Sequence, residues 1–189
     1  MSKLIPGKHF ANDIAFDSQQ NIYVTDSFAG AVYKITPTGI ATVFAKDELF
    51  KTQGVGLNGI VFHPDGFLIV DNSAKGQLFK IELKNPKNVQ RIMTDQYFVG
   101  ADGLLLNDKN TLTMVVNGGT DKIFKLNSTD NWASAKVAAS TLVTDRFTYP
   151  STATQNGADV WVMNAQFNQL LDSNSVPVKK FAIQKVIYK

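Results

Sequence analysis

Four oxygen-bearing side chains recur at the same place in a repeated sequence pattern. They are Asn12, Asn58, Asp102 and Ser151, which lie 46, 44 and 49 residues apart. Amide, carboxylate and hydroxyl oxygens are hard ligands, which suit Ca²⁺ or Mg²⁺ better than a soft transition metal. A turn-forming role would explain any one of them. Three in register, at one end of each repeat, favour a cation site.

Two more titratable groups lie close to Asn12 in the sequence. His9 precedes it by three residues and could act as a general base near a cation-bound water, or could simply be a solvated loop histidine. Asp13 follows it directly. Because side chains alternate along a strand, we expect only one of Asn12 and Asp13 to face the ligand.

A second set of polar side chains ends the next strand of each repeat. These residues could orient the ligands, or they could cap the turns that follow them, and the sequence leaves both roles open. They are Asp26, Asp71, Asn117 and Asn164.

The elements that must position these residues also repeat. Each repeat has a polar residue opening one strand, then a turn, then an alternating strand such as Asn21–Asp26. In three repeats a third strand follows, as at Ala31–Ile35. Short strands with turn signals every ~40–50 residues are typical of four-stranded propeller blades. A β-sandwich would not repeat the polar position four times in register. The lysines of the third strands, such as Lys80, are expected on a solvated face.

The pattern predicts an all-β chain that forms one partial propeller domain over residues 1–189. The propeller is of the six-bladed type, with about four blades present in an open or incomplete ring. Its fourth blade stops at a third strand, Phe181–Val186, after an insertion at 167–177, and residues 4–7 look like the tail of a preceding blade. Unpaired strand edges in such a ring invite self-association. The blades are expected at about 9–50, 54–95, 98–144 and 147–189.

Composition excludes several classes of function. Cys is absent, which rules out disulfides, thiolate zinc sites and a cysteine nucleophile, and two His cannot make a three-histidine metal site. The net charge of +3 is spread along the chain, so nucleic acid is not expected as a partner. No apolar run approaches ~18 residues, so no membrane span is expected. The first ten residues do not read as a signal peptide; the default location is the cytoplasm, although a longer parent could be exported.

The chain resembles the superfamily of senescence-marker-protein, gluconolactonase and luciferin-regenerating-enzyme-like propellers, often called calcium-dependent phosphotriesterases. The resemblance extends from about His9 to Val186 and rests on the order and spacing of short motifs. These are Asn12–Ala15, Tyr23–Ser27, Leu57–Ile60, His63–Gly66, Asp102–Gly103, Tyr149–Thr154, Val162–Gln166 and Phe181–Val186.

This resemblance implies a metal-dependent hydrolase of a lactone or related ester, with a cation at the channel mouth as Lewis acid and water activator. It implies Asn58, Asp102 and Asn12 as metal ligands. Asp102, with His9, is the expected catalytic group, and Asn12 and Ser151 are expected to contact a small-molecule substrate. An acidic ligand of the family comes from a first blade that this sequence does not contain. We therefore expect Ca²⁺ to bind weakly to this chain alone.

Two alternatives remain open at this point. One is a non-enzymatic propeller that binds a small molecule or a protein at the same mouth, because the fold alone does not decide function. The other is an inactive truncated fragment of such a protein.

Overall fold

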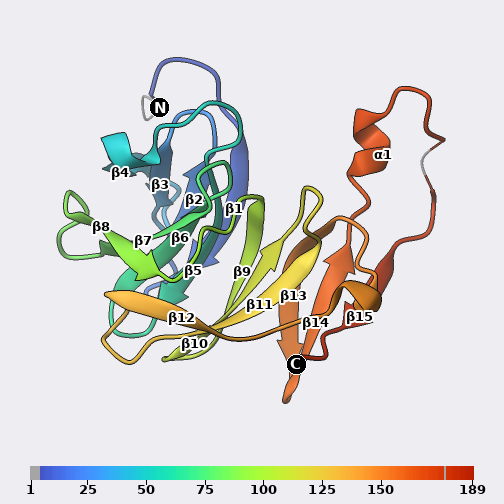
Figure 1. Ribbon diagram of the computed structural model, residues 1–189. Helices are drawn as coiled ribbons and strands as arrows, with labels where there is room; N and C mark the ends of the chain where they lie inside the picture. Colours follow the sequence, from blue (N-terminus) through green and yellow to red (C-terminus); the bar gives the residue numbers. More distant parts are fainter. Residues whose placement is uncertain (1–4, 177) are drawn as a thin grey trace.

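The computed structural model describes residues 5–176 and 178–189 of the chain. Leu4, in the expected tail of a preceding blade, and Pro177, at the end of the expected insertion, lie outside the described residues. The described part is almost entirely β-structure, arranged as successive blades (Figure 1). The strands are β1 Ala11–Phe16, β2 Ile22–Asp26, β3 Ala31–Ile35, β4 Ala41–Lys46, β5 Leu57–His63, β6 Phe67–Asn72, β7 Gln77–Glu82, β8 Val89–Thr94, β9 Ala101–Asp108, β10 Thr111–Val116, β11 Lys122–Asn127, β12 Ser134–Ser140, β13 Pro150–Asn156, β14 Asp159–Asn164 and β15 Ala182–Lys185.

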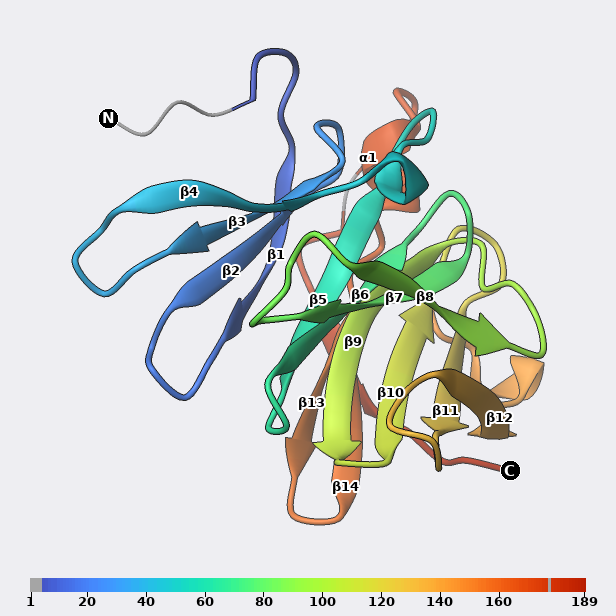
Figure 2. The same ribbon diagram turned by 90° about the vertical axis from the view of Figure 1, so that its left-hand side faces the viewer.

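Each blade is an antiparallel meander in which strands adjacent in sequence pair with each other. Blade 1 has the order β1-β2-β3-β4, and blades 2 and 3 repeat it with β5 to β8 and β9 to β12. Blade 4 has three strands, β13-β14-β15. The innermost strands contact one another in chain order, β1 with β5, β5 with β9 and β9 with β13, and they lie side by side in Figure 2. The predicted all-β propeller with about four blades is confirmed.

The central blades are buried on both faces, which explains why β6 is apolar along most of its length. Leu68 and Val70 point into a cluster shared with blade 1. Phe67 and Ile69, which alternate with them, point into a cluster shared with blade 3. Successive side chains of a strand point to opposite faces, so a blade between two others must be apolar at every position.

Blades 2 and 3 are also joined at their outer edges. β8 pairs in parallel with β12 through Met93 and Ser134 and through Thr94 and Ala135. The two blades therefore form one eight-stranded sheet, whose end strands β5 and β9 meet again at the centre.

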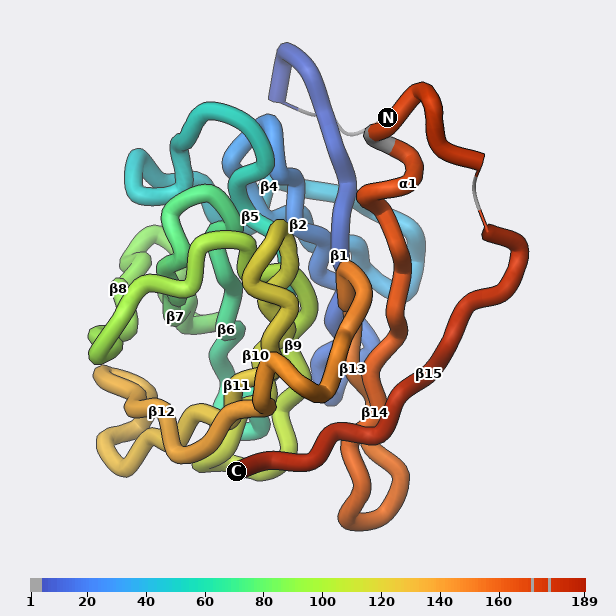
Figure 3. Tube along the Cα trace, turned by 45° about the vertical axis from the view of Figure 1, so that its right-hand side comes forward, coloured from blue at the N-terminus to red at the C-terminus, as the bar shows by residue number. Residues whose placement is uncertain are grey.

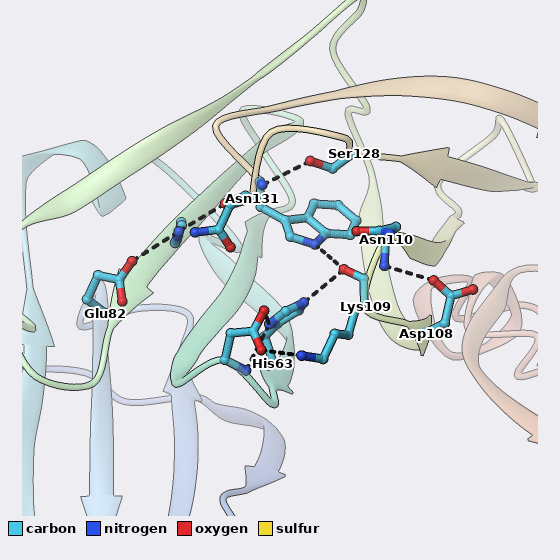
Figure 4. A network of polar contacts seen from close by, with 10 residues as sticks. His63, Glu82, Asp108, Lys109, Asn110, Ser128 and Asn131 are labelled. Atoms are coloured by element: carbon cyan, nitrogen blue, oxygen red, sulfur yellow. Dashed lines mark hydrogen bonds and ion pairs between the residues drawn. The ribbon is translucent and has the colours of Figure 1, made fainter.

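A hydrogen-bond network pins the same two blades together at the mouth away from the predicted site (Figure 4). The Lys109 carbonyl accepts from the Trp132 indole N–H at 2.8 Å and from His63 Nε2 at 2.8 Å. His63 Nδ1 also lies 3.2 Å from the Asp65 amide, which donates to it. Lys80 is buried rather than solvated as the sequence predicted, because its ammonium donates to the Asn131 carbonyl at 2.9 Å.

The end of the chain links blade 4 to blade 3. The Lys189 amide donates to the Ser140 carbonyl of β12, and the Ser140 amide donates back to the Lys189 carbonyl. The last residues thus run beside β12 of the preceding blade (Figure 3). Short helical turns lie outside the blades, at η1 Glu48–Phe50, η2 Val143–Asp145 and α1 Asn168–Leu171. Within the described residues, no helix is long and apolar enough to cross a membrane.

Candidate active site at the channel mouth

A β-bulge at the start of the innermost strand recurs in every blade and shapes the site. In blade 1, Ala11 pairs with Asp26 and Ile14 with Val24, so β1 has one more residue than β2 over this stretch. The same offset occurs in β5, β9 and β13. A bulge bends its strand and turns side chains away from simple alternation. The bulged pairs are Asn12-Asp13, Asn58-Gly59, Asp102-Gly103 and Ser151-Thr152.

These bulges bring most of the predicted site residues to two adjoining pockets. Asn12, Asn58 and Asp102 line both a pocket of about 320 Å³ and a smaller one of about 170 Å³. Ser151 lines the smaller pocket. His9 lines neither pocket.

Asp102 is held by an amide from the second strand of its own blade. Asn117 Nδ2 donates to Asp102 Oδ2 at 2.5 Å and to the Pro150 carbonyl at 3.0 Å. A carbonyl only accepts, so the second bond fixes which end of the Asn117 amide faces Asp102. Burial raises the pKa of Asp102 to about 7, the Asn117 amide opposes that shift and the charge of Asp13 adds to it. Asp102 can therefore exchange a proton near neutral pH.

Asn58 presents an amide oxygen that is buried without a partner. Its backbone carbonyl accepts from the Thr25 hydroxyl at 2.6 Å, which fixes the strand. Its side-chain Oδ1 has no hydrogen-bond partner among the described residues. Buried polar atoms are nearly always paired, so this oxygen calls for a ligand or a water.

Asn12 is oriented in a similar way. Its Nδ2 donates to Ser27 Oγ at 3.0 Å, and the Ser27 hydroxyl donates its own proton to the Leu57 carbonyl at 2.7 Å. The serine oxygen can then only accept from Asn12. This leaves Asn12 Oδ1 as the atom available to a ligand.

Two glycines let the innermost strands approach each other below these ligands. A Cβ on Gly59 would lie 2.2 Å from the Asp102 carbonyl oxygen, and one on Gly103 would lie 2.5 Å from the Ser151 carbonyl oxygen. Only glycine fits at such distances.

Blade 1 has Asp13 at the position of these glycines, and its placement corrects a sequence prediction. Its carboxylate accepts from the Ile14 amide at 2.8 Å and from the Ile60 amide of blade 2 at 3.2 Å. Asp13 and Asn12 both line the smaller pocket, whereas strand alternation predicted that only one would face it. The bulge is the reason. Burial raises the pKa of Asp13.

The second set of polar residues divides between the two roles that the sequence left open. Asn117 orients Asp102, as described above. Asp26 caps its turn by accepting from the Phe28 and Ala29 amides, at 3.2 and 3.0 Å, and also pairs with His9 Nδ1 at 2.6 Å. Asn164 accepts from the Thr148 amide at 2.8 Å.

Asp71, the remaining member of that set, lies beneath the bulge of blade 2. Its Oδ2 accepts from the Gly59 amide at 3.0 Å, and its Oδ1 is buried without a partner in the described part of the chain. Burial, then the charges of Asp102 and Asp13, raise the pKa of Asp71 well above its usual value.

The side-chain oxygens at the mouth are of the type that binds a hard cation, although only one of the groups is a carboxylate. Across residues 5–176 and 178–189, no group of three or more acidic or histidine side chains has the geometry to hold a metal. A cation here would rest on Asn58 Oδ1, Asn12 Oδ1 and the carboxylate of Asp102. Affinity for Ca²⁺ follows the number of charged ligands, so this set is suited to weak binding.

Aromatic side chains form the part of the larger pocket that sequence reasoning missed. Phe10, Tyr149 and Phe167 line it together with the polar residues. They come from segments that precede β1, precede β13 and follow β14. No periodicity marks these positions, although each lies next to a motif already noted in the sequence.

The comparisons with known proteins find structural neighbours but no sequence relatives. No protein-family model matches the chain, and no curated protein matches it. Virginiamycin B lyase from Staphylococcus aureus superposes with a TM-score of 0.63 at 18% identity, over 84% of this chain and 50% of that one. The Malassezia sympodialis allergen Mala s 1 gives 0.62 at 18%, over 82% and 50%. A protein of unknown function from Bacteroides caccae gives 0.59 at 12%, over 94% and 62%.

The chain thus spans about half the length of the first two neighbours. At sequence identities this low, the structural similarity shows only that the folds are alike. Together with the blades described above, it shows that the chain has the β-propeller fold.

Proposed function

We propose that this chain carries the cation-dependent hydrolytic site of a lactonase or related esterase. The observation that supports it is the unpartnered Oδ1 of Asn58, buried in the pocket that Asp102 and Asn12 also line. An oriented amide oxygen with no protein partner, next to a carboxylate, is what a hard cation requires.

Each residue of the site has its own role in the proposed hydrolysis. Asn58, Asp102 and Asn12 would hold Ca²⁺, and the bound cation would polarise the substrate carbonyl and lower the pKa of water. Asn117 keeps the Asp102 carboxylate pointed into the pocket. Asp102 would accept the proton of the attacking water. Ser151, at the smaller pocket, offers a hydroxyl to the substrate.

His9 has a different place in this proposal. Asp26 holds its Nδ1, which leaves Nε2 as the nitrogen available for proton transfer. Because His9 does not line the pocket, we assign it the secondary role of exchanging protons with solvent. Asp102 is the group that acts on water.

A hydrolysis assay with a panel of lactones and aryl esters tests this proposal. We expect turnover that rises with added Ca²⁺, disappears with chelator and falls at least 100-fold in Asp102→Asn. Asp108→Asn is the matched control, since it changes the same residue type at the other, exposed end of β9. Turnover that is indifferent to divalent cations, or equal in the Asp102→Asn and Asp108→Asn variants, would overturn the proposal.

A second candidate is a binding propeller without catalysis. It is favoured by the lack of a cluster of three acidic or histidine ligands in the described ranges. Tight binding of a small ligand in chelator, with no turnover of any ester in the panel, is the result that would select it.

A further inference from the structure

The larger pocket joins a polar ligand set to an aromatic wall. Asn58, Asp102 and Asn117 supply its polar side, and Phe10, Tyr149 and Phe167 supply aromatic rings. Phe10 and Phe167 are 44% and 41% exposed, although large apolar side chains gain from burial. Adjacent exposed rings beside buried polar groups are typical of a small-molecule site, in which a few polar groups orient an apolar ligand.

The rings are paired with one another or with a neighbour. Tyr149 and Phe167 lie edge to face, with centroids 5.9 Å apart at 67°. Phe10 packs against Phe28 with centroids 5.4 Å apart. Edge-to-face pairs prefer fixed geometries, so the Tyr149 and Phe167 rings are partly held before a ligand arrives. The Phe10–Phe28 pair is tilted, at 39°.

Backbone strain flanks this wall. Tyr149 has φ +50° and Gln166, which directly precedes Phe167, has φ +55°. Residues other than glycine rarely adopt this left-handed region, and such outliers gather at functional sites.

Hydrogen bonds hold the two strained segments against each other. The Ala165 amide donates to the Tyr149 carbonyl at 3.1 Å, and the Gln166 amide donates to the Thr148 carbonyl at 3.2 Å. The Tyr149 amide donates to Asp121 Oδ2 at 3.2 Å. The surrounding structure therefore dictates where the Tyr149 and Phe167 rings lie.

We propose that this pocket selects substrates in which an aryl group is attached directly to the lactone ring or to the ester group. The carbonyl would lie on the polar side, held through the cation that the proposed function places on Asn58 and Asp102, and the aryl group would lie against Tyr149, Phe167 and Phe10. A polyhydroxylated lactone would place its hydroxyl groups against these rings and lose their hydration without replacement hydrogen bonds. A pocket of about 320 Å³ suits a ligand of one or two rings. This inference rests on the proposed function, since that function assigns the carbonyl to the polar side.

The test uses binding rather than turnover, so that the two proposals can fail separately. Phenyl-substituted, unsubstituted and polyhydroxylated δ-lactams resist hydrolysis but keep the ring and the carbonyl. We expect the phenyl lactam to bind at least tenfold more tightly than either of the others, in calorimetric titrations with 10 mM Ca²⁺ present. Phe167→Ala should abolish this preference, and Phe181→Ala is the control, because Phe181 is exposed and does not line the pocket.

Two further variants guard against a folding artefact. Phe167→Leu keeps apolar bulk but removes the ring and should lower the preference, while Tyr149→Phe keeps the ring and should retain it. Equal binding of the three lactams, or a preference unchanged in Phe167→Ala and Phe167→Leu, would overturn the inference. A preference for the phenyl lactam in a chain that hydrolyses no lactone would refute the proposed function and leave the aromatic selectivity standing.

Discussion

At the scale of residues, the site is defined by how few charges it has and how well they are held. The Asp102 carboxylate lines both pockets, and burial raises its pKa to about 7. Asp71, beneath it, is fully buried. Asn12 provides a neutral oxygen that Ser27 orients, and Asn58 provides one that is buried without a partner among the described residues. In the proposed function, a bound cation would supply the positive charge for this site.

The first prediction concerns pH and stability in the absence of cations. The folded-state pKa values of Asp102, Asp71 and Asp13 lie above the ordinary value, so these three groups bind more protons in the folded chain than in the unfolded chain. The lowered pKa values of Asp17, Asp26, Asp65 and Asp130 act in the opposite direction, but only near and below the ordinary carboxyl value. The free energy of unfolding should therefore rise as the pH falls from about 7 toward about 5. Urea unfolding in chelator at a series of pH values measures this slope.

Substitution assigns the slope to a residue. Asp102→Asn should flatten it, because an amide does not titrate, and Asp108→Asn should leave it as in the wild type. A slope of the same size in the Asp102→Asn variant would show that Asp102 is not one of its sources.

At the scale of elements, the bulged innermost strands decide where the polar residues point. The sequence predicts these strands because a polar residue opens each of them at the same position of every repeat. It does not predict the bulges, since a bulge is a property of the register between two strands. That is why Asn12 and Asp13 were expected on opposite sides.

Other differences have similar non-local causes. Lys80 looks solvated in sequence, yet it is buried because Asn131, 51 residues away, offers it a carbonyl. The aromatic wall has no sequence period, because Phe10, Tyr149 and Phe167 belong to loops that the blades bring together. The polar residues of the mouth could be found from the sequence because each occupies the same position of a repeated strand.

The close approach of β5 and β9 carries the second prediction. Gly59→Ala would place a Cβ 2.2 Å from the Asp102 carbonyl oxygen, which is backbone and cannot move freely. We expect a loss of about 3 kcal/mol in the free energy of unfolding. Gly66→Ala, in a turn with nothing within 4 Å of the added Cβ, should lose only about 1 kcal/mol from its positive φ. Equal losses in urea unfolding would contradict this account of the glycines.

At the scale of the whole molecule, the two end blades each leave one apolar face uncovered. Blade 1 exposes Ile14, Phe16 and Val43, at 52, 56 and 40%. Blade 4 exposes Ile183, at 62%, on the face that carries the half-buried Met163, its cross-strand partner. Between blades 1 and 2, and between blades 2 and 3, such faces pack against each other.

We propose that a second copy of the chain covers these faces in solution, because it offers the kind of apolar blade face that covers blades 2 and 3. Mass-resolved size measurements over a range of concentrations should show dimers or larger species. Phe16→Lys together with Val43→Lys should shift the population toward monomer, whereas Val143→Lys, at an exposed turn outside the blades, should not. A wild-type chain that stays monomeric at every concentration would refute this prediction.

The central claim is that the channel mouth holds a divalent cation on Asn58, Asn12 and Asp102. Calorimetric titration of Ca²⁺ into the purified chain at neutral pH tests it most directly. We predict weak binding at one site, with a dissociation constant of about 10⁻⁴ to 10⁻³ M given the single carboxylate. The heat should vanish in Asn58→Ala and Asp102→Asn and persist in Asp108→Asn. No binding by the wild type up to 10 mM, or binding unchanged in Asn58→Ala and Asp102→Asn, would contradict the account.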